Sequence, residues 1–204
     1  MKFIKWKMLI ITVLCCLLPI LFGVFLWNDL PDTMAIHFNV QNEPDNYASK
    51  GFVVFGIPCL MALLQIFCCF INDWNAYKHG DRKKLEMVTK WILPVMTAVL
   101  QVFTLGYSLG WFRDANKVAA LLVGCIFLVI GNYLPKFDYI KHYDISTEKA
   151  RKINRFIGYE SVVMGLLFIG SAFLPPIFTV VCIFLLIPYA VISVIYGLMI
   201  GLKK

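Results

Sequence analysis

Hydrophobic residues occur along this chain in long blocks that are separated by short polar stretches. A helix needs about 20 residues to cross the hydrocarbon core of a bilayer, and six blocks reach or approach that length. They cover residues 8–27, 51–71, 91–111, 118–134, 156–174 and 177–202. The blocks lack the alternation of apolar and polar residues that a membrane barrel requires. The pattern therefore predicts an all-α fold, a polytopic integral membrane protein with six transmembrane helices.

Composition supports this class. The chain has 204 residues, of which 15% are charged, and its mean hydropathy is +0.77, values outside the range of soluble globular domains. The first block follows three lysines, as a signal peptide would, but its apolar stretch of about 20 residues exceeds the usual 7–15. We therefore expect it to be a retained helix.

Basic residues are distributed unevenly among the connections. Sixteen of the nineteen lysines and arginines fall in the two termini and in the connections 72–90 and 135–155. Only Lys50, Arg113 and Lys117 fall on the other side. Cytoplasmic loops of membrane proteins carry such an excess, so both termini are expected in the cytoplasm. The net charge of +7 is thus explained by topology and by contact with the lipid bilayer, and no direct nucleic acid binding is expected.

Residues suited to catalysis or metal binding do not cluster in this sequence. The three histidines, His37, His79 and His142, all lie outside the blocks, and the H-E-x-x-H motif is absent. The seven cysteines lie inside the blocks without C-x-x-C spacing, so they are interpreted as packing residues. We expect no enzyme activity, no metal and no cofactor.

Glu160 is the one acidic residue inside a predicted block. An ionised side chain in hydrocarbon marks a functional or paired site by default. An ion pair with Lys136 is the favoured interpretation, while proton or ligand coupling and simple solvation are the alternatives. Gln65, Gln101 and Asn132 are also deep enough to form hydrogen bonds between helices.

The connection before the fifth block is expected to end in a helix. The segment "EKARKINRF", residues 148–156, carries strong helix formers, and Asp144 or Ser146 could cap its N-terminus. This helix is expected to continue into block 156–174.

One long polar stretch, "AIHFNVQNEPDNYASKG" at residues 35–51, separates the first two blocks. A turn is expected at residues 43–46, because Pro44 presets its backbone angle and the following residues bond locally. An extended segment around His37 would turn His37 and Asn39 to one face and their apolar neighbours to the other. The loop 28–50 is expected to be extracellular. Its candidate partner-binding residues are His37, Asn39, Glu43, Pro44, Asp45 and Lys50, and the alternatives are a solvated connector or a loop packed on the bundle.

Two motifs carry a resemblance to known families. The stretch "LPDTMAIHFNVQNEPDNYASKG", residues 30–51, resembles the signature of the DUF1648 family. The stretch "GNYLPK", residues 131–136, is similar to the core motif of the SdpI family of bacterial immunity proteins. The resemblance implies a DUF1648-like helical hairpin at residues 1–75 and an SdpI-like four-helix membrane region at residues 76–204.

The resemblance also implies a function and a location. Members of that family protect the producing bacterium from a secreted peptide toxin, and they relay a signal by holding a cytoplasmic repressor at the membrane. We therefore expect a multi-pass immunity protein of the bacterial cell membrane that binds or senses a toxin. A small multi-pass transporter or permease is the alternative.

The motif of Asn132, Pro135 and Lys136 is expected on the cytoplasmic side. It would either dock a soluble partner or fix the geometry of the two helices around it. The G-I-R-T-P-W-like stretch that usually follows in the family is replaced here by "FDYIKHYDISTEKARKINRFIGY" at residues 137–159.

Overall fold

The computed structural model describes residues 4–79, 83–136 and 147–202 of the chain. Within these residues, six helical spans are long and apolar enough to cross a membrane: Trp6–Phe25, Phe52–Lys78, Glu86–Ser108, Ala115–Lys136, Glu148–Ser171 and Ile177–Ile200. The predicted six-helix membrane architecture is thus confirmed. The chain divides into two compact units, Met1–Ala115 and Asn116–Lys204.

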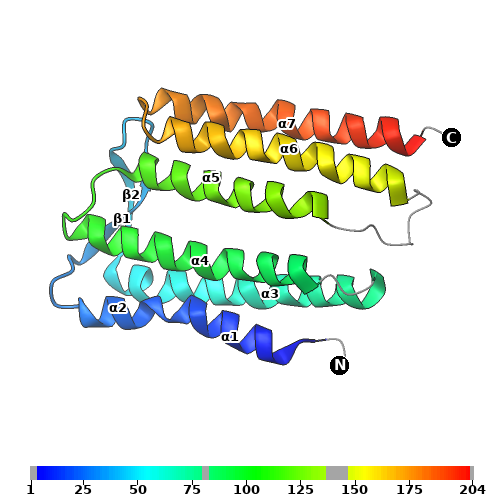
Figure 1. Cartoon of the computed structure of the whole chain (residues 1–204). Helices are drawn as coiled ribbons and strands as arrows, with labels where there is room; N and C mark the ends of the chain where they lie inside the picture. The colour runs from blue at the N-terminus through cyan, green and yellow to red at the C-terminus, as the bar shows by residue number, and fades with distance from the viewer. Residues whose placement is uncertain (1–3, 80–82, 137–146, 203–204) are drawn as a thin grey trace. The chain divides into compact units, whose positions relative to one another are not determined.

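The first unit contains helices and one small sheet (Figure 1). Its elements are α1 (Trp6–Leu17), α2 (Pro19–Phe25), β1 (Thr33–Phe38), β2 (Pro44–Ser49), the π-helix η1 (Phe52–Gly56), α3 (Ile57–His79) and α4 (Lys83–Ser108). The first predicted span is divided at Pro19, which has no backbone N–H to continue the hydrogen-bond ladder of α1. The sheet lies at the end of this unit opposite to the start of α1.

Helices α3 and α4 extend well beyond their predicted blocks. Residues 72–90 were expected to form a cytoplasmic connection, but α3 runs to His79 and α4 begins at Lys83. The physical reason is that residues 72–79 contain neither proline nor glycine, so nothing in the local sequence stops the helix. Polar residues at this end therefore face one another on two helices.

The core of the first unit lies where α2, η1 and α4 meet the sheet. Leu30, Met34, Val53, Val54 and Leu105 are buried there. A Cβ atom on Gly23 would lie 2.7 Å from Val54 Cγ1, so glycine allows α2 to approach η1 closely. Gln101 Nε2 on α4 donates a hydrogen bond of 2.9 Å to the Val53 carbonyl, which confirms the predicted interhelical role of Gln101.

The second unit consists of α5 (Ala115–Tyr133), the 3₁₀ turn η2 (Leu134–Lys136), α6 (Thr147–Ser171) and α7 (Ile177–Leu202). Helix α6 runs unbroken from the basic segment into the apolar one, as predicted. The expected capping residues, Asp144 and Ser146, lie outside the described residues.

Glycine pairs bring α5 and α6 together. A Cβ atom on Gly131 would lie 2.7 Å from the Gly158 carbonyl oxygen, and one on Gly124 would lie 2.8 Å from the Gly165 carbonyl oxygen. The two glycines on each helix are seven residues apart. Small residues at such crossings allow the close backbone contact that stabilises helix pairs in lipid.

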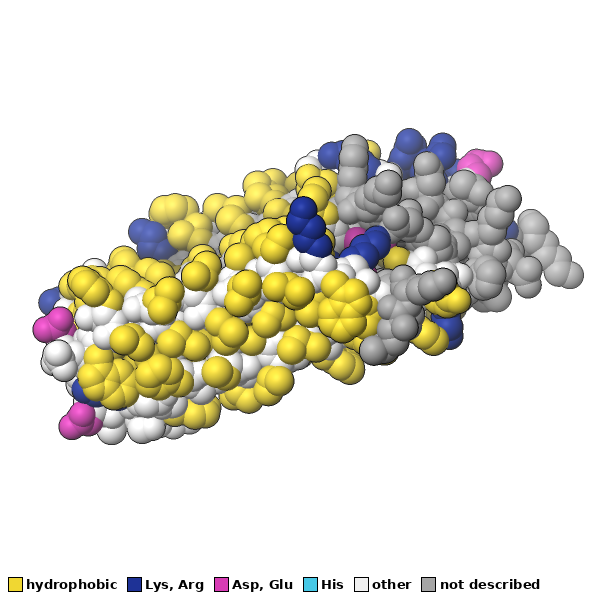
Figure 2. Space-filling view, turned by 90° about the horizontal axis from the view of Figure 1, so that it is seen from below, with side chains coloured by type: hydrophobic (Ala, Val, Ile, Leu, Met, Phe, Trp, Pro, Cys, Tyr) yellow, Lys and Arg dark blue, Asp and Glu magenta, His cyan; other side chains and the backbone are white. Residues whose placement is uncertain are grey.

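Large hydrophobic side chains are exposed along the helices. Hydrophobic side chains cover much of the face drawn in Figure 2. Phe25 is 82% exposed, Leu21 67% and Phe184 66%. A surface of this kind is expected where lipid tails replace water as the solvent.

Candidate functional site

The polar stretch between the first two membrane spans folds into a β-hairpin. Strands β1 and β2 pair antiparallel, with Met34 opposite Ala48 and Ala35 opposite Tyr47. The turn lies at residues 39–43, where the Asn39 N–H donates to the Glu43 carbonyl over 2.9 Å. Asn42 has a positive φ of 66°, a conformation that asparagine tolerates better than most residues.

The turn was predicted at residues 43–46, and that prediction is wrong. Pro44 is the first residue of β2, a position where a strand tolerates proline because no ladder donor is lost inside the strand. The expected extended segment around His37 is present as β1.

The hairpin is fastened to the helices at its turn and along one strand. The Asn42 side chain donates to the Arg113 carbonyl and accepts from the Ala115 N–H, both over 2.8 Å. The Phe38 ring packs edge-on against Tyr107 of α4, with 4.7 Å between the ring centroids. Met34 is 1% exposed. These contacts attach the hairpin to α4 and to the start of α5.

A polar edge remains accessible on the hairpin. His37 Nδ1 and Asp45 Oδ1 are 2.5 Å apart across the two strands, while their side chains are 67% and 43% exposed. Asn39 lies in the turn, where its Oδ1 accepts from the Glu43 N–H over 2.9 Å. The accessible groups of the predicted set are thus His37, Glu43 and Asp45.

The expected alternation of faces along β1 holds only in part. Phe38 packs on the bundle as predicted, but Ile36 is 38% exposed. The pairing register is irregular between Ala35 and His37 and again between His37 and Phe38. Such bulges re-aim side chains, which explains why Ile36 is exposed while Phe38 packs on the bundle.

Lys50 lies at the base of the hairpin and has other partners. Its Nζ donates to the Trp27 carbonyl over 3.3 Å and lies 5.2 Å from the centroid of the Trp27 ring. It also forms an ion pair of 3.4 Å with Asp32, and the Lys50 side chain is only 15% exposed. Lys50 therefore closes the loop between α2 and η1.

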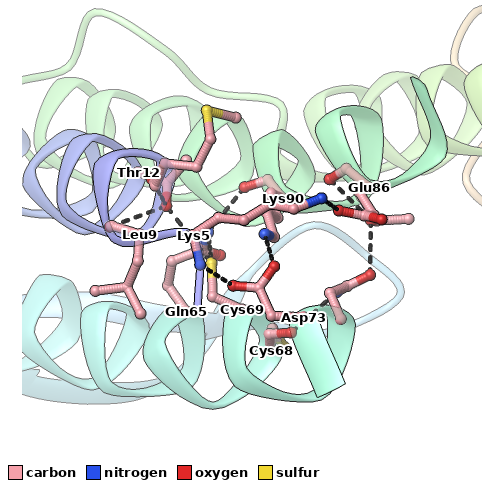
Figure 3. A network of polar contacts seen from close by, with 12 residues as sticks. Lys5, Leu9, Thr12, Gln65, Cys68, Cys69, Asp73, Glu86 and Lys90 are labelled. Atoms are coloured by element: carbon pink, nitrogen blue, oxygen red, sulfur yellow. Dashed lines mark hydrogen bonds and ion pairs between the residues drawn. The ribbon is translucent and has the colours of Figure 1, made fainter. Parts of the chain in front are cut away.

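A buried ionic network lies near the start of α1, at the end of the first unit away from the hairpin (Figure 1), and Figure 3 shows its contacts. Lys90 Nζ on α4 pairs with Asp73 Oδ1 on α3, and the two side chains are 1% and 0% exposed. The backbone N–H of Lys5 donates to the other oxygen, Asp73 Oδ2, over 3.0 Å. Lys5 Nζ pairs with Glu86. The network therefore joins the start of α1 to both α3 and α4.

Uncharged groups extend the network toward the middle of the helices. Gln65 Nε2 donates to the Lys90 carbonyl over 2.8 Å, which confirms its predicted interhelical bond. Thr12 Oγ1 lies 3.7 Å from Cys69 Sγ. The Gln65 Oε1 atom is buried and, among the described residues, has no hydrogen-bond partner.

Sequence reasoning missed this network because Asp73 and Lys90 both fell in a stretch interpreted as a cytoplasmic connection. The signal that could have found them is the lack of a helix breaker between Pro58 and Gly80. A helix continued through that stretch places Asp73 inside the bundle, where a buried carboxylate requires a cationic partner.

The motif of Asn132, Pro135 and Lys136 closes α5. Lys136 Nζ donates to Asn132 Oδ1 over 2.8 Å, so among the described residues Asn132 bonds within its own helix end. A Cβ atom on Gly158 of α6 would overlap Pro135 Cγ. Pro135 therefore packs on the backbone of α6, while Asn132 and Lys136 remain exposed.

The predicted ion pair between Lys136 and Glu160 is not formed in the described structure. Glu160 Oε2 instead accepts a hydrogen bond of 2.8 Å from Ser193 Oγ on α7. The reason is geometric, because the Lys136 ammonium is already held by Asn132 and lies 5.3 Å from the centroid of the Tyr133 ring. Glu160 therefore faces α7.

Comparisons with known proteins agree with this architecture. Residues 14–62 match the family model "Domain of unknown function (DUF1648)". This range runs from the last turn of α1 through the hairpin into α3. No solved structure matches the chain.

A curated relative covers most of the chain. The Immunity protein SdpI of Bacillus subtilis (strain 168) is 26% identical over 164 residues, which are 76% of this chain and 77% of SdpI. Together with its six apolar helices, this similarity identifies the chain as a multi-pass bacterial membrane protein. It is similar to the immunity protein SdpI over most of its length and matches the DUF1648 model at residues 14–62.

Proposed function

We propose that this protein protects its bacterium from a secreted peptide toxin by binding the toxin at the β-hairpin, without catalysis. The observation that carries the immunity role is the similarity to Immunity protein SdpI over 76% of the chain.

The hairpin is the surface best suited to recognition. It combines an accessible edge of His37, Glu43 and Asp45 with a framework fixed by Phe38 and Asn42. A fixed framework lowers the conformational entropy lost when a partner binds. Carboxylates on the edge favour a cationic partner. In the proposed orientation the hairpin faces the outside, where a secreted toxin arrives.

Asn132 and Lys136 form a second surface. They are exposed at the C-terminal end of α5. This end is cytoplasmic in the proposed orientation. In this proposal they dock a soluble repressor and so relay the occupancy of the hairpin.

Transport is the rival function. Transporters typically bind substrate near the bilayer midplane at discontinuous helices. The division between α1 and α2 at Pro19 and the π-helix η1 are interruptions of this kind. Gln101 satisfies the Val53 carbonyl at η1, so protein bridges this interruption. This hydrogen bond supports the proposal of binding over the rival of transport.

The experiment expresses the chain in a toxin-sensitive bacterium and exposes the cells to a panel of secreted peptide toxins. Survival and the cell-associated amount of labelled toxin are both followed, with and without collapse of the proton gradient. Survival with unchanged toxin efflux supports protection by binding. Survival that depends on energised efflux of the toxin supports the transporter instead.

A further inference from the structure

A groove runs along the second unit between α6 and α7. It has a volume of ≈460 Å³, and its lining includes Glu160, Val163, Met164 and Leu167 of α6 and Pro188 and Tyr189 of α7. Volumes of this size are typical of small-molecule sites, which are mostly apolar and carry a few placed polar groups.

The lining contains one charged group. Glu160 Oε2 accepts the hydrogen bond from Ser193, and no other described residue donates to the Glu160 carboxylate. The neighbouring hydroxyl of Tyr189 is 3.0 Å from Ser161 Oγ, so it is already used between the helices. An acidic residue inside a membrane span marks a paired or ligand-binding site by default. The groove therefore lacks a positive charge at one end.

The rest of the groove is apolar and runs along the helix axes. Glu160, Val163, Met164 and Leu167 follow the helical spacing of one face of α6. Glu160 and Leu167 are separated by about 10 Å along the axis at 1.5 Å per residue. Pro188 breaks the hydrogen-bond ladder of α7 beside this face.

The charged end lies toward one edge of the bilayer. Ser193 is about 24 Å along α7 from Ile177, and the hydrocarbon core is about 30 Å thick. A ligand whose head reaches Glu160 near that edge can lay its tail along Val163 and Leu167 in the core.

We propose that this groove binds an amphipathic organic cation, with an ammonium head on Glu160 and a single apolar tail along α6 and α7. Charge complementarity selects this class over a neutral lipid or a fatty acid. A neutral lipid has no cation for Glu160, and a fatty acid would place a second carboxylate beside Glu160. The proposal stands independently of the immunity function.

The test uses the full chain in nanodiscs of zwitterionic phosphatidylcholine, with empty nanodiscs as the reference for partitioning. Octylammonium is titrated calorimetrically beside 1-octanol and octanoate, which have the same tail length. The variants are Glu160→Gln, which removes the charge, and Val163→Trp, which fills the groove. Leu166→Trp is the matched control, because Leu166 is exposed on the same helix and outside the lining.

We expect saturable binding of octylammonium that is at least tenfold tighter than binding of either comparison compound. Glu160→Gln should weaken it at least tenfold and Val163→Trp should abolish it, while Leu166→Trp leaves it unchanged. Val163→Trp retains Glu160, so this variant still tests the proposal if Glu160→Gln does not fold. Equal binding of 1-octanol, or wild-type binding in the Val163→Trp protein, would overturn the proposal and leave a groove filled by lipid.

Discussion

The Asp73 carboxylate on α3 and the Lys90 ammonium on α4 form an ion pair from which solvent is almost completely excluded. Both oxygens of Asp73 are used, because the second accepts the backbone N–H of Lys5. A buried charge with two partners fixes the relative register of α3, α4 and the start of α1.

Breaking this pair should destabilise the first unit strongly. Removing one partner leaves an uncompensated buried charge, which costs about 3–5 kcal/mol. Lys90→Met and Asp73→Leu should each lower the free energy of unfolding by about that amount, measured by unfolding in mixed micelles. The double variant should recover most of the loss, since two apolar side chains replace the pair. A double variant as unstable as the sum of the single variants would show that the two charges do not interact.

The close approach of α5 and α6 predicts a position-specific effect at glycine. Gly158→Val should destabilise the second unit by about 1–3 kcal/mol, because the new side chain overlaps Pro135. Gly170→Val on the same helix is the control, since a Cβ atom there meets nothing within 4 Å. The loss of stability in Gly158→Val and in Gly170→Val is measured by thermal unfolding, which is followed by gel filtration. Equal losses at both positions would contradict the proposed packing role of the Gly158–Pro135 contact.

The turn of the hairpin depends on Asn42 for two reasons, its positive φ and its side-chain hydrogen bonds. Asn42→Gly keeps the conformation and removes the bonds, whereas Asn42→Ala removes both. We expect amide hydrogen exchange at residues 33–49 to be fastest in Asn42→Ala, intermediate in Asn42→Gly and slowest in the wild-type protein. The neighbouring Gln41→Ala should exchange like wild type, because Gln41 is exposed. Unchanged exchange in Asn42→Ala would mean that the turn is held by other contacts.

The orientation is tested with single cysteines in a chain whose seven native cysteines are replaced by alanine. We expect a membrane-impermeant maleimide to label Gln41→Cys in intact cells and Lys84→Cys only after lysis, since positive residues favour the cytoplasmic side. Labelling of Lys84→Cys alone in intact cells would reverse the proposed topology.

Hydropathy predicted the six helices because each apolar block needs no information from elsewhere in the chain. It missed the Asp73–Lys90 pair because a charged residue near the end of a block resembles a loop residue until its partner on another helix is known. The hairpin was predicted as an extended segment with a turn, but the choice between Asn42 and Pro44 for the turn depends on Arg113 and Ala115, about 70 residues away. The same limit applies to Lys136 and Glu160, because Lys136 bonds to Asn132 and Glu160 bonds to Ser193.

Toxin recognition at the hairpin is tested by the dose of toxin that kills half of a sensitive bacterial population expressing the chain. For one toxin of the panel, we predict that expression raises this dose at least tenfold. His37→Ala, Glu43→Ala and Asp45→Ala, at membrane abundance equal to wild type, should each remove most of that protection, whereas Gln41→Ala retains it. Full protection by all three variants would contradict recognition at the hairpin. An unchanged lethal dose for every toxin, with the wild-type chain present in the membrane, would contradict the immunity function itself.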